Sequence, residues 1–149
     1  MDSMEIVRAF YTALDSKDMD QVDQYISESY QLVDFTPQPM DRNALLELLR
    51  QLKKGLPNLQ HSLSNIRMDG KVVKVTVQIS GTNSAHIDLR HMGIGVVPRS
   101  MKFIIFPNGN FEFTVQNEKI TVQRDVSPIS PNRRMPGMLK ALGVNTMGS

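Results

Sequence analysis

The 149-residue sequence has no cysteine and no tryptophan, and aromatic residues make up only 6% of it. Without cysteine there can be no disulfide bond, no thiolate zinc site and no cysteine nucleophile, and the chain suits a reducing cytoplasm. No apolar run approaches the roughly 18–20 residues that span a bilayer, and the N-terminal residues lack the apolar core of a signal peptide. We therefore expect a soluble, cytoplasmic protein.

The sequence also has little excess charge of either sign. Its 17 basic and 15 acidic residues give a net charge of +2, which is too small to predict a nucleic-acid partner or an anionic membrane surface. The glycine-rich motifs of nucleotide-binding proteins and the G-x-S-x-G motif of α/β-hydrolases are absent. The length fits one domain, large enough to bury a core without covalent staples.

The first half of the sequence has the periodicity of helices. Apolar residues recur on one helical face in three places, which predicts helices at residues 3–15, shortly after residue 18, and from 42 to 55. The expected N-caps of these helices are Ser3, Asp18 and Asp41. Residues 30–35 are rich in β-formers and stop at a proline-rich break, which predicts a short strand.

From about residue 60 the period changes to two, which is typical of strands. We expect strands at 60–68, 71–81, 100–106, 110–116 and 119–126. An Asp-Gly turn at 69–70 joins the first two, and a loop without regular structure covers 83–99. A proline-rich link then leads to a short helix at 136–143. We interpret 1–128 as the domain and 129–149 as a C-terminal extension rather than a second domain.

The last hairpin is predicted in detail because its turn at Asn117-Glu118 has two residues. On one face the expected pairs are Val115 with Ile120, Phe113 with Val122, and Phe111 with Arg124. On the other face they are Thr114 with Thr121, Glu112 with Gln123, and Asn110 with Asp125. A slip of one residue would change every pair.

Helices gathered at the start and strands at the end predict an α+β fold. Three segments together resemble the SnoaL-like polyketide cyclase group of the nuclear transport factor 2-like superfamily: VRAFYTALDSKDMDQVDQYIS, RNALLELLRQLKKGLPNLQHSLSNIRMDGKVVKVTVQISGT and FEFTVQNEKITVQRDV. The similarity covers about residues 4 to 128. It implies a cone-shaped, cystatin-like fold, in which three N-terminal helices pack on a curved, mainly antiparallel sheet.

The resemblance also implies a reaction. In the cyclases of this group an aspartate on the last strand is the acid/base of an intramolecular aldol ring closure that uses no metal and no cofactor. That aspartate matches Asp125. The group often has a partner histidine on the neighbouring strand, but His61, His86 and His91 all lie outside 110–116. Arg124 also stands where many relatives carry tryptophan.

These considerations give Asp125 as the candidate catalytic residue, with no metal ligand. The candidate substrate-binding residues are Tyr11, Tyr25, Phe35, Asn110, Glu112 and Gln123. Alternatively, Asp125 caps the turn at Ser127 or pairs with Arg124 or Arg99, and Glu112 faces solvent. We interpret His86, Asp88 and His91 as polar surface, and the basic group of Arg133, Arg134 and Lys140 as a solvated tail.

Two kinds of function fit the sequence. One is a cofactor-free cyclase, isomerase or hydrolase that acts on a small apolar carbonyl compound. The other is a non-catalytic module that binds a small molecule or mediates dimerisation. The resemblance implies a homodimer, and a sheet covered by helices on one face has a second face to protect.

Overall fold

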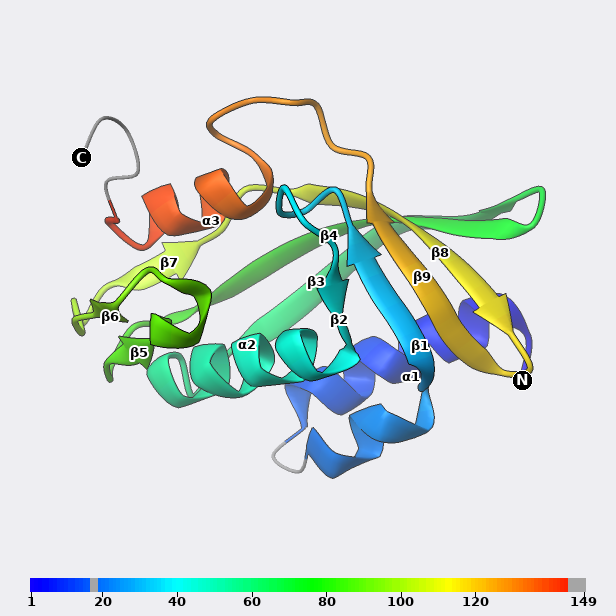
Figure 1. Cartoon of the computed structure of the whole chain (residues 1–149), viewed down its shortest axis with the longest axis horizontal. Coiled ribbons are helices and arrows are strands. Elements are labelled where there is room, and N and C mark those ends of the chain that lie inside the picture. The colour runs from blue at the N-terminus through cyan, green and yellow to red at the C-terminus, as the bar shows by residue number, and fades with distance from the viewer. Residues whose placement is uncertain (17–18, 145–149) are drawn as a thin grey trace.

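The computed structural model describes residues 1–16 and 19–144 (Figure 1). In chain order its elements are α1 (Ser3–Asp15), the 3₁₀ helix η1 (Met19–Gln24), β1 (Ile26–Val33), β2 (Met40–Asp41), α2 (Arg42–Gly55), β3 (Gln60–Asp69), β4 (Val72–Thr82), β5 (Ile87–Asp88), the 3₁₀ helix η2 (Arg90–Met92), β6 (Val96–Val97), β7 (Phe103–Ile105), β8 (Gly109–Gln116), β9 (Lys119–Asp125) and α3 (Arg134–Ala141). No helix in these two ranges is long and apolar enough to cross a membrane.

One curved sheet organises the molecule. Its strand order is β2-β1-β9-β8-β4-β3, with β7 also paired to β4. Only the pairing of β1 with β9 is parallel, and the other pairs are antiparallel. The sheet arches over α1 and α2, which lie along its concave side (Figure 1). This arrangement confirms the expected α+β fold, with helices packed on a curved, mainly antiparallel sheet.

The N-terminal helices begin at polar caps. The carboxylate of Asp41 accepts a hydrogen bond from Ala44 N at 2.8 Å, so the predicted cap of α2 is confirmed. The cap of α1 is Asp2 rather than the predicted Ser3, and its side chain accepts from Glu5 N at 2.8 Å. Asp18, the predicted cap of the second helix, lies outside the described residues.

Lys53, in the last turn of α2, joins the two long helices. Its Nζ donates to the carbonyl oxygens of Leu14 at 2.9 Å and Ser16 at 2.5 Å. These carbonyls end α1, where helix carbonyls have no intrahelical donor. The lysine therefore caps the neighbouring helix as well as standing near the C-terminus of its own.

Aromatic side chains fill the space between α1 and the sheet. The ring of Phe113 on β8 lies edge-on to Phe10 at 6.2 Å and to Tyr11 at 5.9 Å between centroids. All three side chains are buried. Edge-to-face contacts at such distances add to the stabilisation from burial. These contacts hold α1 against the concave face of the sheet at β8, the strand that pairs with β9.

The segment 83–99 is more ordered than the predicted loop. It holds the short β5–β6 pair and the 3₁₀ turn η2. Ile87 and Leu89 are fully buried. Ile87 packs against Gly55 at the end of α2, where an added Cβ would overlap Ile87 Cγ1. The absence of a side chain at Gly55 therefore lets this segment close against α2.

The C-terminal helix α3 begins two residues before the predicted start and ends near Gly143, as expected. Met138 and Leu139 belong to the same buried cluster as α1, α2 and the sheet. Met135 N donates to the carbonyl oxygen of Phe35 at 3.2 Å. The C-terminal helix therefore packs into the same core as α1, α2 and the sheet.

Candidate functional site

The pairing of β8 with β9 determines which residues face the interior. Val115 pairs with Ile120 as predicted, but the register then shifts by one residue. Thr121 has no partner in this register, Thr114 pairs with Val122, and the rest of the hairpin follows the shift. The predicted pairs beyond Val115 and Ile120 are therefore wrong, because one extra residue on β9 reverses the side to which each later side chain points.

The shifted register turns Asp125 toward the inside of the cone. Asp125 pairs with Phe111 at the end of β9 and is only 1% exposed. Its Oδ1 accepts a hydrogen bond from Ser127 N at 2.9 Å, so the aspartate does cap the turn that follows β9. Its Oδ2 is buried and accepts no hydrogen bond from the described residues.

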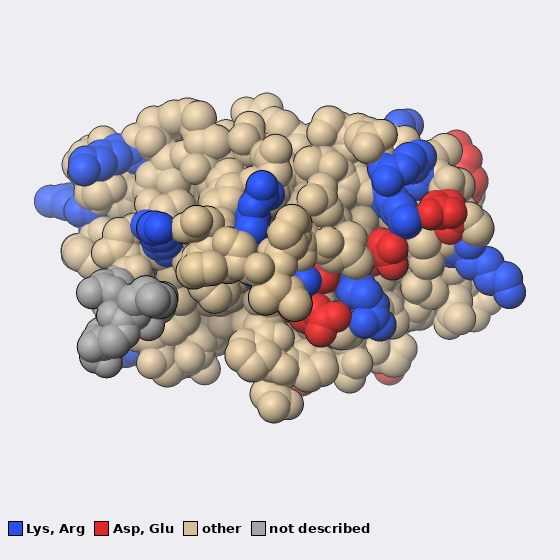
Figure 2. All heavy atoms as spheres, turned by 90° about the horizontal axis from the view of Figure 1, so that it is seen from above, with Lys and Arg blue, Asp and Glu red and all other residues tan. Residues whose placement is uncertain are grey.

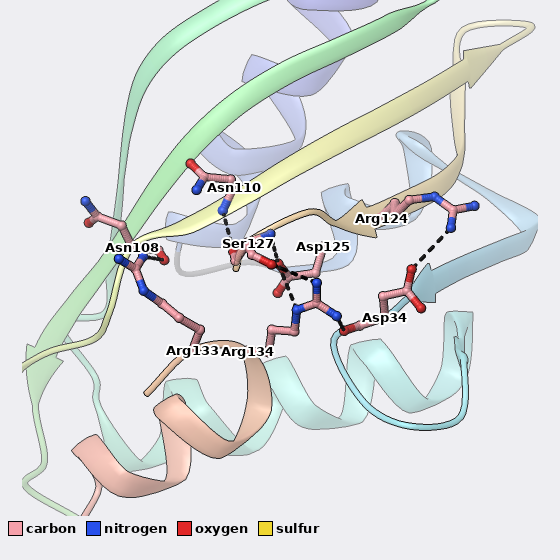
Figure 3. Close-up of polar contacts among 8 residues, drawn as sticks. All are labelled: Asp34, Asn108, Asn110, Arg124, Asp125, Ser127, Arg133 and Arg134. Atoms are coloured by element: carbon pink, nitrogen blue, oxygen red, sulfur yellow. Dashed lines mark hydrogen bonds and ion pairs between the residues drawn. The ribbon is translucent and has the colours of Figure 1, made fainter. Parts of the chain in front are cut away.

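Arg134, the first residue of α3, points at this carboxyl group (Figure 3). Its Nη1 donates to the carbonyl oxygen of Asp34 at 2.9 Å, and its Nη2 donates to that of Ser127 at 2.7 Å. The Nε atom lies 3.9 Å from Asp125 Oδ1, too far for a hydrogen bond, and has no acceptor in the described part of the chain. The guanidinium is thus held by two backbone carbonyls beside an acid that it does not bind directly.

The electrostatics of Asp125 reflect this setting. Burial raises the pKa of its carboxyl above the ordinary value, while the hydrogen bonding of Ser127 and the charge of Arg134 oppose that rise. Burial has the largest effect because it disfavours the charged form. A carboxyl group with a raised pKa that can still ionise is suited to proton transfer.

Two adjoining spaces lie in front of this pair. Asp125 and Arg134 border an inner cavity of about 50 Å³, whose other walls are mainly apolar. An open cleft of about 1090 Å³ lies outside it, between the segment after β1 and the C-terminal link with α3. Phe35 and Arg134 line both spaces. The arginine therefore stands where the inner cavity meets the cleft.

The structure brings some of the predicted binding residues near Asp125. Gln123 points inward two residues before it and accepts a 2.6 Å hydrogen bond from the buried Tyr30 hydroxyl. Tyr11 is buried too, and its pKa is raised by burial first and then by the charge of Asp125. Phe35 lines the inner cavity, whereas Tyr25 is half-buried beside the start of β1.

Asn110 and Glu112 are not brought to the site. Asn110 accepts a 2.9 Å hydrogen bond from the Thr76 hydroxyl, and its side chain points away from Asp125 (Figure 3). Glu112 pairs with Arg124 and lies 3.7 Å from Lys74 Nζ. Both side chains lie on the opposite face of the sheet from Asp125, because the register shift separates them from it.

The histidines lie elsewhere. His61 is buried on β3, with Nδ1 2.6 Å from Asp15 Oδ1 and its ring 5.3 Å from that of Tyr11. Asp88 pairs with Arg90 on the surface, and this partner lowers the pKa of Asp88 to about 2. Within residues 1–16 and 19–144 no group of three His, Asp or Glu is placed to hold a metal ion.

Sequence reasoning missed Arg134. Lys140 is exposed and donates to Asn132 Oδ1 at 2.7 Å, and the half-buried Arg133 donates to Asn108 O at 2.8 Å. Arg134 instead is mostly buried, so the interpretation of all three as a solvated tail is wrong for it. Two adjacent arginines look alike in a sequence, and only the position of α3 distinguishes them.

The outer surface near α3 is basic. Figure 2 views the molecule from the side of the C-terminal link. In its left half, which holds α3, the charged side chains visible among the described residues are Lys or Arg, whereas the right half shows both signs. A negatively charged ligand would therefore meet favourable charge on approaching this end.

The chain belongs to the SnoaL-like domain family, whose model matches residues 7–123. No curated protein matches it in sequence. The family match ends two residues before Asp125 and well before Arg134, so the acid and its neighbouring cation lie beyond the matched segment.

Solved structures share the fold at low sequence identity. AclR from Streptomyces galilaeus, described as a proposed hydroxylase, is 15% identical with a TM-score of 0.71, over 95% of this chain and 84% of that one. IdmH from Streptomyces antibioticus, described as a proposed polyketide cyclase, is 20% identical with a TM-score of 0.67, over 96% and 100%. A Catenulispora acidiphila protein with a ketosteroid isomerase-like fold is 14% identical with a TM-score of 0.64, over 95% and 94%. These likenesses confirm the fold class.

Proposed function

We propose that this protein binds a small, mainly apolar carbonyl compound in the cone and that Asp125 exchanges protons with it without a cofactor. The observation that carries this proposal is the buried carboxyl of Asp125, a residue that borders the inner cavity and has one side-chain oxygen that accepts no hydrogen bond from the described residues. Such an oxygen is placed to take a proton from a ligand, and burial raises the pKa of the carboxyl toward a useful range.

The ligand would occupy both the inner cavity and the outer cleft. The inner cavity of about 50 Å³ holds only a few atoms, since one water occupies about 30 Å³ of liquid. It suits a single carbonyl group with its neighbouring carbon. The apolar body of the ligand would lie in the outer cleft of about 1090 Å³, which is a common size for ligand sites.

Proton exchange tests the proposal without knowledge of the natural substrate. The protein is mixed in D₂O with a series of enolisable ketones and 1,3-diketones, and loss of the α-proton signal is followed by NMR. Asp125→Asn is expected to slow the exchange by roughly 10²–10⁴-fold, the usual contribution of a positioned acid/base. Glu112→Gln, which alters a carboxylate on the neighbouring strand that faces outward, is the matched control and should leave the rate unchanged.

Two results would exclude the acid/base role. One is exchange no faster with wild type than with buffer for every compound in the series. The other is equal rates for wild type and Asp125→Asn. Compounds that bind without exchanging would instead favour a non-catalytic binding module.

We also propose that the chain forms a homodimer. Met101, Phe103 and Ile105, on and beside β7, are 64%, 61% and 57% exposed. Apolar side chains so close together on a strand are typical of a surface that another chain covers. Sedimentation equilibrium should give twice the chain mass, and Phe103→Lys should shift the mass toward one chain. A wild-type monomer at high concentration would exclude the dimer.

A further inference from the structure

We propose that Arg134 forms an anion subsite in the cone, where its Nε–H holds the oxygen of the ligand that becomes negatively charged when Asp125 removes a proton. The inference rests on the proposed function of Asp125 and adds to the same site a second residue, which would bind the oxygen that becomes charged. It assigns a binding role to a residue of the C-terminal extension, outside the matched family segment.

The first argument is the hydrogen bonding of the guanidinium. Two of its nitrogens are already engaged by the carbonyl oxygens of Asp34 and Ser127, which fix its plane. Its Nε–H is left without an acceptor among the described residues, although it is buried. A buried charged donor without an acceptor is costly, and a ligand oxygen in the inner cavity would satisfy it.

The second argument is the match between this donor and Asp125. The side chain of Asp125 is 1% exposed, and its Oδ2 also accepts no hydrogen bond from the described residues. The residues that carry this unsatisfied donor and this unsatisfied acceptor both border the inner cavity, and Arg134 Nε lies 3.9 Å from Asp125 Oδ1. A ligand with a carbonyl group and a proton on the adjacent carbon offers both complementary partners. Its oxygen would accept a hydrogen bond from Nε–H, and its carbon would give the proton to Oδ2.

The resulting step balances without a further reactant. Asp125 Oδ2 takes the proton from the carbon, and the electron pair of the C–H bond forms the C=C bond of the enolate. The carbonyl π pair moves to oxygen, which Arg134 Nε–H holds through a charge-assisted hydrogen bond. Asp125 then returns the proton to carbon, or to the alkoxide formed when the enolate carbon adds to a second carbonyl group.

The third argument is the backbone of Arg134. Its φ is +58°, in the left-handed region that residues other than glycine seldom adopt. Such conformations are retained where the surrounding structure compensates for them, often at functional sites. Arg133 has an ordinary extended backbone with φ −129°, and its side chain turns to Asn108 instead. The two adjacent arginines thus differ in backbone conformation, and their side chains reach different partners (Figure 3).

Binding of a charged and a neutral ring of similar size tests the subsite. The probes are 1,3-cyclohexanedione, an enolate at neutral pH, and cyclohexanone, each titrated into ¹⁵N-labelled protein and followed by NMR. Wild type and Arg133→Gln are expected to prefer the dione. Arg134→Gln should lose roughly tenfold or more of that preference, the usual effect of one charge-assisted hydrogen bond. An unchanged preference in Arg134→Gln would overturn the proposal, as would a wild type without any preference.

Two further measurements separate a binding role from a structural one. Arg134→Lys keeps the charge but not the planar donors, so it should retain part of the preference if α3 stays in place; a loss equal to that of Arg134→Gln would contradict a role for charge. The pKa of Asp125, followed by carboxyl ¹³C NMR, should rise in Arg134→Gln and not in Arg133→Gln.

The proposed function and the subsite can fail independently. If Arg134-dependent binding of the dione persists in a protein that exchanges no protons, the subsite stands and the acid/base role of Asp125 fails. If proton exchange depends on Asp125 while dione binding ignores Arg134, the subsite fails and the proposed function stands.

Discussion

The hydrogen bond between Tyr30 and Gln123 connects β1 to β9 just before Asp125, and its removal should be measurable. The Tyr30 hydroxyl donates to Gln123 Oε1 at 2.6 Å, and Tyr30 is 1% exposed. Tyr30→Phe leaves that amide oxygen buried without its donor, which costs about 1–3 kcal/mol of unfolding free energy. For a chain of this length that corresponds to a fall in Tm of about 2–12 °C.

Urea denaturation and thermal unfolding measure this effect against a matched control. Tyr25→Phe removes the same atom from a half-buried ring and is expected to stay within about 0.5 kcal/mol of wild type. Replacing both partners, as in Tyr30→Phe with Gln123→Met, should cost less than the sum of the single changes, because no buried polar atom of the pair is then left alone. Equal effects of Tyr30→Phe and Tyr25→Phe would refute the reasoning, and so would strict additivity in the double variant.

Three further predictions follow from packing and charge. Phe113→Ala should lower the unfolding free energy by about 3–5 kcal/mol, since the ring is fully buried against α1; urea midpoints close to wild type would contradict this. Gly55→Ala should lower stability by about 1–3 kcal/mol through overlap with Ile87 Cγ1. Gly55→Ala combined with Ile87→Ala, which removes that atom, should cost less in thermal melts than the sum of the single changes. Burial raises the folded-state pKa of Asp125 above its ordinary value of 3.8. At a pH between these two pKa values, the folded state keeps a proton that the unfolded state has released. Wild-type stability should therefore fall as the pH rises through that window, by about 1.36 kcal/mol for each unit of pKa difference. Asp125→Asn should lack this fall in urea titrations across the window, and an identical slope in both proteins would show that the group does not titrate as argued.

The parts of the fold that the sequence predicted well are those with a local cause. Asp41 caps α2 through its own side chain three residues from the amide that it binds. The hairpin between β3 and β4 is present as predicted, with its two-residue turn at Gly70 and Lys71, one residue later than expected, and Gly70 has a positive φ. The assignment of Asp125 to the end of the last strand was also local, since it followed from the alternation of that strand and from the family resemblance.

The parts that the sequence did not predict depend on contacts between distant residues. Ile87 is buried because Gly55, far upstream, leaves room for it. Arg134 cannot be distinguished from Arg133 until α3 is placed beside Ser127 and Asp34. Asn110 and Glu112 were grouped with Asp125 because the composition of β9 is compatible with either register, and nothing local marks the residue at which the register shifts.

That shift has a consequence for how such a site can arise. Thr121 is the extra residue of β9, and everything after it faces the opposite way from what an uninterrupted ladder would give. A ladder that kept Thr121 but lost the shift would place Arg124 opposite Phe111 and turn Asp125 to the outer face, with no substitution at either position. The bulge at Thr121, rather than the identity of any one residue, therefore decides whether the cone contains an acid, because loss of the bulge would turn Asp125 outward while the sequence and the fold stay the same.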